Sequence, residues 1–155
     1  MENEEANIYK NKVHKILARS YSVYLLFFLI GVSLNSVFNF QVFASSVVVP
    51  IGFIFLALGT ILIVWAQNTS RNLKKETLTK ETFAKGPYRF TSTPTNFGLF
   101  FLMLGFGMVA NSFFVMVCSC VAFVIARFVF LVQEEKVLAE KYGIPYLEYK
   151  KMVKF

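Results

Sequence analysis

The feature that most constrains this chain is the absence of charge over two long stretches. Residues 20–70 and 90–126 contain no Lys, Arg, Asp or Glu, and 56% of all residues are hydrophobic. A water-soluble fold of 155 residues has too little interior to bury 51 consecutive uncharged residues and then another 37. Because about 20 apolar residues cross a bilayer as a helix, each stretch is long enough to cross and return. The sequence therefore predicts an all-α integral membrane protein with about four transmembrane helices.

Turn residues between the apolar runs divide the chain into segments. Transmembrane helices are predicted over about 20–38, 45–67, 96–110 and 113–133, with short turns near Asn39 and at Asn111-Ser112. Residues 1–19 are predicted as an N-terminal interfacial helix, because an apolar stripe runs among their charges. The polar segment 68–95 is predicted as a cytoplasmic loop, and 134–155 as a cytoplasmic helical segment. Residues 1–155 thus form one membrane domain, with helix pairs at 20–67 and 96–133.

The basic residues indicate the orientation of these helices. Of the 16 Lys and Arg residues, most lie before the first apolar run, between Arg71 and Arg89, or after Glu135. The turns near Asn39 and Asn111 carry none, so the positive-inside rule places both termini and the central loop in the cytoplasm. The net charge of +7 is explained by this topology and by attraction to anionic lipid headgroups, and it does not indicate nucleic acid.

Small residues in the apolar helices are predicted to serve packing. Gly98 and Gly105 are seven residues apart and therefore share one helix face, where small residues let helices approach closely. Cys118 and Cys120 are two residues apart in one helix, so their side chains diverge and no disulfide is implied. With one histidine, His14, and no Asp in the chain, no metal site is predicted.

Two polar clusters flank the second charge-free stretch. Gly86-Pro87-Tyr88-Arg89 precedes it, and Glu134-Glu135 follows it. A helical hairpin that crosses a bilayer and returns brings its two ends to the same face, so the two clusters are expected to meet. Adjacent glutamates can also simply cap a membrane helix in water, and the pair alone does not distinguish the two roles.

The run from Lys85 to Val153 resembles the C-terminal half of the isoprenylcysteine carboxyl methyltransferases and of the small membrane phospholipid methyltransferases. Those enzymes read roughly Gly-x-Tyr-x-x-x-Arg-His-Pro-x-Tyr-x-Gly, then an apolar hairpin, then Glu-Glu-x-x-Leu, Gly-x-x-Tyr and a Tyr-Lys-Lys tail. This chain has Gly86, Tyr88 and Pro94, then Glu134-Glu135, and the tail Tyr149-Lys150-Lys151, in the same order.

The resemblance implies methyl transfer from S-adenosylmethionine to a lipid-like or isoprenoid acceptor at the cytoplasmic membrane face. The partner is then a membrane lipid or a lipidated substrate. A carboxylate can accept hydrogen bonds from the amino group or ribose of the cofactor, and an aromatic ring can cover its adenine or face its sulfonium. The cofactor contacts that the resemblance implies are Tyr88, Thr93, Pro94, Asn96 and Glu134.

Departures from the family pattern keep a second function open. The family's Arg-His is Ser92-Thr93 in this chain, and its following Tyr is Asn96, so an imidazole that would hold the cofactor is missing. The phospholipid methyltransferases have Asn-Pro at the comparable site, and Thr93 still offers a hydroxyl. The alternative function is a non-catalytic relative, a lipid-binding or assembly subunit.

The catalytic candidates are Glu135 and Arg127. Phe130 stands where the prenylcysteine enzymes place an Arg, and Arg127 lies nearly one turn further back. Either Arg127 reaches the site and neutralises an acceptor or cofactor carboxylate, or it snorkels toward the headgroups. A carboxylate acceptor needs no general base, whereas an amine acceptor has to lose a proton, for which Glu135 is the nearest group. A prenylated cysteine, a phospholipid amine and an isoprenoid all remain open as acceptors.

Overall fold

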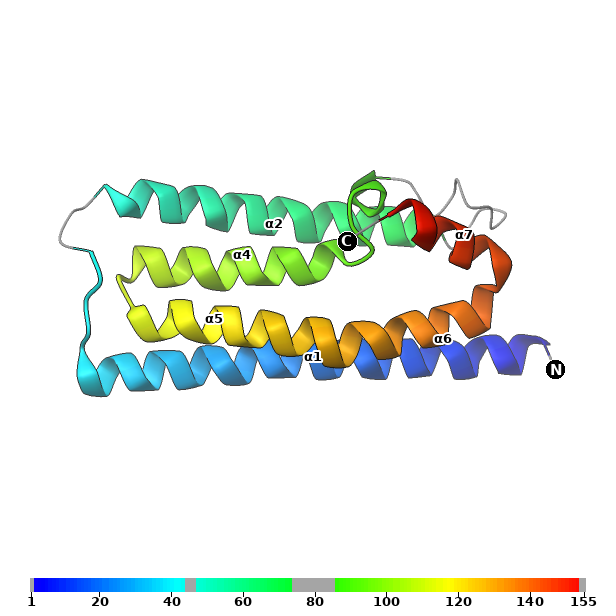
Figure 1. The fold of residues 1–155 in the computed structure, drawn as a ribbon, viewed down its shortest axis with the longest axis horizontal. Coiled ribbons are helices and arrows are strands. Elements are labelled where there is room, and N and C mark those ends of the chain that lie inside the picture. Colours follow the sequence, from blue (N-terminus) through cyan, green and yellow to red (C-terminus); the bar gives the residue numbers. More distant parts are fainter. Residues whose placement is uncertain (1, 44–46, 74–85, 154–155) are drawn as a thin grey trace.

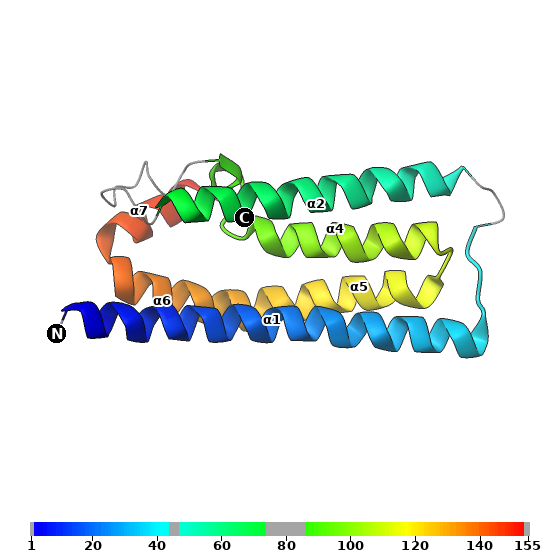
Figure 2. The ribbon, with the colours of Figure 1, turned by 180° about the vertical axis from the view of Figure 1, so that it is seen from behind.

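Long antiparallel helices make up the computed structural model, which describes residues 2–43, 47–73 and 86–153. Figures 1 and 2 agree that α2, α4, α5 and α1 lie side by side in that order. The elements are α1 (Glu2–Phe38), α2 (Val48–Leu73), the 3-10 helix η1 (Gly86–Arg89), α4 (Pro94–Val109), α5 (Phe113–Ile125), the π-helix η2 (Ala126–Leu131), α6 (Val132–Tyr142) and α7 (Ile144–Met152). No strand occurs in these ranges, and the predicted all-α fold is confirmed.

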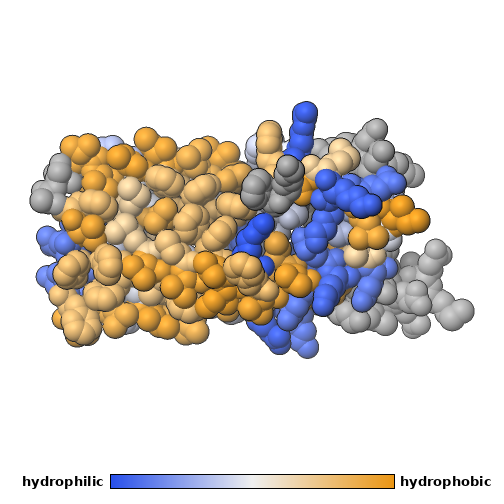
Figure 3. All heavy atoms as spheres, viewed as in Figure 1, coloured by the Kyte–Doolittle hydropathy of each residue, from blue (hydrophilic) through white to orange (hydrophobic). Residues whose placement is uncertain are grey.

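Within the described residues, three helical spans are long and apolar enough to cross a membrane. They are Ala18–Phe38, Val48–Thr69 and Phe113–Glu140. Helix α4 is equally apolar but has only 16 residues, a length of about 24 Å. Figure 3 shows hydrophobic side chains covering one end and the middle of the visible face, with hydrophilic side chains gathered toward the end that holds η1 and α7. The chain is an integral membrane protein with three full-length spans and the shorter α4 between them.

The ends of several helices differ from the prediction. Residues 2–19 are helical as expected, but α1 continues to Phe38 without the expected break at Ser20, because no Gly or Pro lies between Glu2 and Ile30. Helix α2 runs six residues beyond the expected end at Gln67 and takes the first part of the predicted loop. The rest of that loop, residues 74–85, and the expected start of the second helix at 45 lie outside the described residues.

A proline lies in the first turn of two other helices. Helix α4 begins at Pro94 rather than at the expected Asn96, and α7 begins at Ile144, directly before Pro145. Proline is favoured in the first helical turn, where its missing N–H has no intrahelical partner to lose. Pro94 therefore belongs to the helix that it was expected to precede.

Four glycines allow α2 and α4 to pack closely against each other: Gly52 and Gly59 on α2, and Gly98 and Gly105 on α4. A Cβ on Gly59 would lie 2.7 Å from the carbonyl oxygen of Gly98, and one on Gly105 would lie 2.8 Å from the carbonyl oxygen of Gly52. Real Cβ atoms do not approach backbone so closely, so no larger residue fits without separating the helices. The predicted packing role of Gly98 and Gly105 is confirmed, and the seven-residue spacing recurs on the partner helix.

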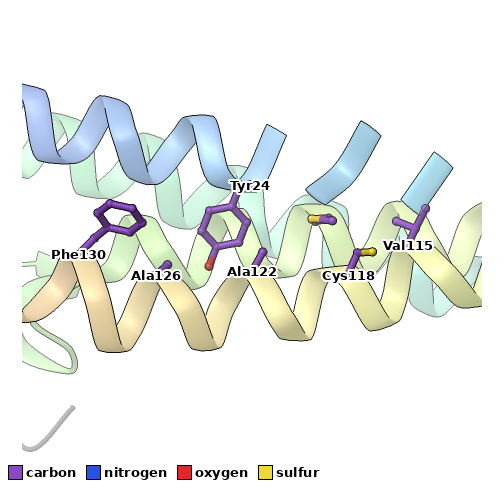
Figure 4. Close-up of a cluster of buried hydrophobic side chains, with 7 residues drawn as sticks. Tyr24, Val115, Cys118, Ala122, Ala126 and Phe130 are labelled. Atoms are coloured by element: carbon purple, nitrogen blue, oxygen red, sulfur yellow. The ribbon is translucent and has the colours of Figure 1, made fainter. Parts of the chain in front are cut away.

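The core between α1 and the α5–η2 helix is built around Tyr24. Its ring is 4% exposed and lies over Ala122 and Ala126, whose small side chains leave room for it (Figure 4). Phe130 closes one side of this cluster, and Cys118 lies further along it as a buried free thiol. The packing fixes α1 against the helix that leads to Glu134.

At the end of the molecule opposite η1 and α7, the side chain of Asn111 joins the turn between α4 and α5 to the segment that follows α1. Its Oδ1 accepts hydrogen bonds from the backbone N–H groups of Val42, at 3.1 Å, and Phe43, at 2.9 Å. Its Nδ2 donates to the carbonyl oxygen of Phe43 at 2.9 Å. The elements η1 and α7, which carry much of the polar chemistry described below, lie at the opposite end of the helices (Figure 1).

Candidate functional site

The segment from η1 to the start of α4 is folded tightly against α2. Gly86 has a φ of +60°, and a Cβ there would lie 2.6 Å from Thr69 Oγ1. The carbonyl oxygen of Pro87 accepts the N–H of Thr91 at 3.3 Å, and Thr91 Oγ1 in turn accepts the N–H of Thr93 at 3.3 Å. Pro87 and Pro94 are fully buried. Tyr88, Thr93 and Pro94 are therefore held in one compact unit.

Helix α7 joins this unit to the glutamate pair. The Tyr149 hydroxyl donates a hydrogen bond to the carbonyl oxygen of Tyr88 at 2.7 Å. The next residue, Lys150, forms an ion pair with Glu135. Neighbouring residues of one helix thus bind η1 on one side and α6 on the other. The two polar clusters that the sequence separates by the apolar hairpin are brought together in this way.

An aromatic cluster fills the space where these elements meet. Tyr146, Tyr149 and Val153 are buried there, and Tyr88 and Leu138 pack against them. Burial raises the pKa of the Tyr146 phenol above its ordinary value, and the negative charges of Glu135 and Glu134 raise it further. The Tyr146 side chain therefore lies close enough to both carboxylates for their negative charges to raise its pKa.

Three of the predicted site residues carry a buried polar atom that has no hydrogen-bond partner in the described structure. These atoms are Thr93 Oγ1, Asn96 Nδ2 and Arg127 Nη1. A buried polar group left unsatisfied costs about 1–3 kcal/mol, so such groups are uncommon and indicate a ligand or water. A fourth such atom, Asn35 Oδ1, belongs to the opposite half of the α1 span.

The Asn96 amide is fixed by α1. Tyr24 donates its hydroxyl hydrogen to Asn96 Oδ1 at 2.7 Å. Because this bond occupies the oxygen, the amide is left with its NH₂ group as the unpaired half. Tyr24 was not among the residues singled out from the sequence, and one polar hydroxyl in a charge-free helix gives no signal that would single it out.

Arg127 lies across from the start of α4. Phe123 of α5 packs against Phe97 and Phe100 of α4, with ring centroids 5.1 Å and 4.8 Å apart. Since α4 and α5 are antiparallel, η2, which continues α5 and contains Arg127, runs from this contact toward the start of α4, where Thr93 and Asn96 lie. The Nη1 atom of the guanidinium is buried, although the residue as a whole is partly exposed, and the choice between reaching the site and snorkelling stays a prediction.

Sequence reasoning also missed two residues of α7 that shape the site. Tyr149 and Lys150 served only to identify the Tyr-Lys-Lys tail, and the structure gives them contacts to Tyr88 and Glu135. The Tyr-Lys-Lys tail motif was the available signal. A lysine can form an ion pair with a predicted carboxylate, and a tyrosine hydroxyl can donate a hydrogen bond. The roles assigned to the site residues themselves stay predictions.

The fold and the site define a class: a small helical membrane protein whose polar residues converge at one end of a transmembrane hairpin. The chain matches the family model described as phospholipid methyltransferase over residues 46–144, more than half of its length. The chain belongs to the phospholipid methyltransferase family, and the resemblance inferred from the motifs is confirmed. The family indicates methyltransferase activity on lipid-like substrates. Comparison with curated proteins gave no match, and neither did comparison with solved structures.

Proposed function

We propose that this protein transfers a methyl group from S-adenosylmethionine to a lipid-like or isoprenoid acceptor at the cytoplasmic face of a membrane. The observation that carries the proposal is the double contact of α7, which holds Tyr88 through Tyr149 and Glu135 through Lys150. These contacts unite the two motifs of the family at one place. Membership of the family supports the reaction class.

The residues at this place fit the cofactor. S-adenosylmethionine, when bound, supplies an activated methyl group on a sulfonium sulfur. Its amino group and ribose hydroxyls need acceptors, which Glu134 provides. The partnerless atoms of Thr93 and Asn96 have hydrogen-bonding capacity to spare for its polar groups. Tyr88 and the buried Pro94 offer apolar surface for its adenine.

Positioning is the main catalytic contribution of these residues. The buried tyrosines of α7 exclude water from the contact between η1 and α6. Holding reactants in line can supply about 7–11 kcal/mol of barrier reduction. For an amine acceptor, the carboxylate of Glu135 takes up the proton, and Lys150 balances the charge of Glu135 while it is ionised. A carboxylate acceptor requires no such transfer.

The distribution of basic residues determines the membrane orientation and the lipid partners in this proposal. Both termini face the cytoplasm in this proposal, and the basic ends of the helices attract anionic lipid headgroups. The acceptor enters from the bilayer. The structure buries Phe130 in the core with 7% exposure, so no cation stands where the prenylcysteine enzymes meet their substrate carboxylate. This favours a phospholipid amine or an isoprenoid over a prenylated cysteine.

Binding of S-adenosylmethionine to the purified full chain, measured by calorimetry in detergent, tests the proposal. Glu134→Gln should weaken binding about 10- to 100-fold, because hydrogen bonds to a charged group are worth about 1.5–3 kcal/mol. Glu140→Gln is the matched control, since Glu140 is an exposed carboxylate on the same helix. Affinity unchanged by Glu134→Gln would remove the role proposed for Glu134.

The second candidate is a non-catalytic lipid-binding or assembly subunit. The observation that favours it is Thr93, which stands where the prenylcysteine enzymes place their imidazole and which makes no side-chain capping bond to α4. The same calorimetry separates the two functions, because a subunit without a cofactor site gives no heat with S-adenosylmethionine. Total lipid extract incubated with methyl-labelled cofactor then identifies the acceptor by the lipid that becomes labelled.

A further inference from the structure

The partnerless atoms of Thr93, Asn96 and Arg127 share a chemical property. Arg127 Nη1 and Asn96 Nδ2 are donors only, and Thr93 Oγ1 can donate as well as accept. A ligand that satisfies all three atoms has to offer acceptors. Because the buried Nη1 atom belongs to a charged guanidinium, a negatively charged acceptor matches it best, since a charge withdrawn from water is costly without an opposite charge.

No described side chain supplies such an anion by pairing with Arg127. Among the residues whose side chains the structure describes, the ion pair that forms joins Lys150 to Glu135. Residues 90–126, which include all of α4 and α5, carry no charge at all. Arg127 lies in η2, directly after α5, and Thr93 and Asn96 lie at the start of the antiparallel α4, so the three residues stand toward the same end of one hairpin.

Two further features favour an anion at this position. Thr93 and Asn96 belong to the first turn of α4, a helix of 16 residues whose N-terminus carries a partial positive charge. The Tyr24 hydroxyl holds Asn96 Oδ1, which keeps the acceptor half of the amide away from the ligand. The Asn96 side chain is therefore held in place by a buried residue of α1.

We propose that Thr93, Asn96 and Arg127 form a buried binding site for an oxyanion, either the phosphate of a phospholipid acceptor or the carboxylate of the cofactor. The naming of these two sources rests on the proposed function, whereas the site itself does not. Thr93 and Arg127 are both departures from the pattern of the prenylcysteine enzymes. The site therefore replaces the imidazole and the arginine of those enzymes with a different set of donors.

Arg127→Gln is the variant that tests the site, with Arg127→Lys as the charge-preserving variant and Arg89→Gln as the control at an exposed arginine. One arm measures calorimetric binding of S-adenosylmethionine and of its decarboxylated analogue. The other arm measures retention of phosphatidic acid and of diacylglycerol with the same acyl chains, by native mass spectrometry of the full chain in detergent. Thermal unfolding of the ligand-free proteins reports on folding.

The expected result is a loss of about 10- to 100-fold in one arm, confined to the ligand that carries the anion. Loss for S-adenosylmethionine but not for its decarboxylated analogue identifies the cofactor carboxylate. Loss for phosphatidic acid but not for diacylglycerol identifies the lipid phosphate. Arg127→Lys should restore part of the affinity. Ligand-free Arg127→Gln should unfold no earlier than the wild type, because it removes a partnerless buried charge.

Two results would overturn the site: Arg127→Gln binding both anionic ligands as tightly as the wild type, or losing anionic and neutral ligands alike. The proposed function fails differently, through absence of S-adenosylmethionine binding by the wild type. In that case the lipid arm still decides whether the oxyanion site exists.

Discussion

In the segment that leads into α4, the hydroxyl oxygen of Thr91 has a hydrogen-bond partner, whereas that of Thr93 has none in the described structure. Thr91 Oγ1 accepts the backbone N–H of Thr93, so its hydroxyl stabilises the turn. Thr93 Oγ1 is buried with no partner in the described structure. The first hydroxyl therefore contributes to folding, and the second is available for a ligand.

Replacement of each threonine by valine, which keeps the shape and removes the hydroxyl, separates these roles. Thr93→Val should leave the melting temperature unchanged and weaken cofactor binding about 2- to 10-fold, the value of one neutral hydrogen bond. Thr91→Val should lower stability by about 1–3 kcal/mol, because it leaves the Thr93 N–H without an acceptor. Thermal unfolding and calorimetry on the same preparations check both. A Thr93→Val protein that unfolds early would show that its hydroxyl has a structural partner.

Residues of the site were predictable to different degrees. Thr93, Asn96 and Arg127 flank a hairpin whose turn is only Asn111-Ser112, and so short a turn leaves the two helices little freedom of register. That these residues lie toward the same end of the hairpin follows from the sequence for that reason. Tyr24 lies about 70 residues away on a helix joined by no short turn, and its bond to Asn96 depends on tertiary packing that periodicity does not encode.

Helix α7 connects η1 with α6, and its tyrosines make that connection sensitive to alkaline pH. Burial raises the pKa of Tyr146 and of Tyr149 above the ordinary value of 10.0. Up to about pH 10 both phenols are protonated in the folded and in the unfolded chain, and their contribution to stability is complete. Above it, the unfolded chain loses these protons first, so the free energy of unfolding falls as pH rises.

Tyr146→Phe should make the melting temperature less dependent on pH above about pH 10, because one of the two raised phenols no longer titrates. The bond from Tyr149 to Tyr88 is untouched by this change, which keeps α7 attached. Thermal unfolding from about pH 8 to pH 11 measures the effect. Equal slopes for variant and wild type would mean that Tyr146 does not contribute to the alkaline loss of stability.

At the scale of elements, the sequence predicted which helices exist better than where they end. The break expected at Ser20 came from the change in composition from charged to apolar, yet the backbone hydrogen bonds of a helix do not depend on that change. The π-helix η2 gave no signal, because it contains neither Gly nor Pro and its residues fit an α-helix equally well. Gly98 and Gly105 were predictive because only small residues allow such close contact.

The whole molecule has two unlike ends, which provides a test of its orientation. The turns joined by Asn111 lie at one end, and η1 and α7 lie at the other (Figure 1). With the positive-inside rule, the first end faces away from the cytoplasm. In a background without Cys120, Gln41→Cys should react with a membrane-impermeant maleimide in intact cells, and Leu147→Cys only after permeabilisation. Both positions are exposed in the fold. The reverse labelling pattern would invert the proposed orientation.

The short α4 also has a consequence for the choice of membrane. Its 16 residues span about 24 Å, about 6 Å less than a hydrocarbon layer of about 30 Å. With the turn at Asn111 held at one surface, Thr93 lies below the other surface by about one helical turn. A thicker bilayer would place the N-terminus of α4 deeper among the acyl chains, and a thinner bilayer would place it nearer to water. Turnover should therefore depend on acyl-chain length as well as on the headgroup.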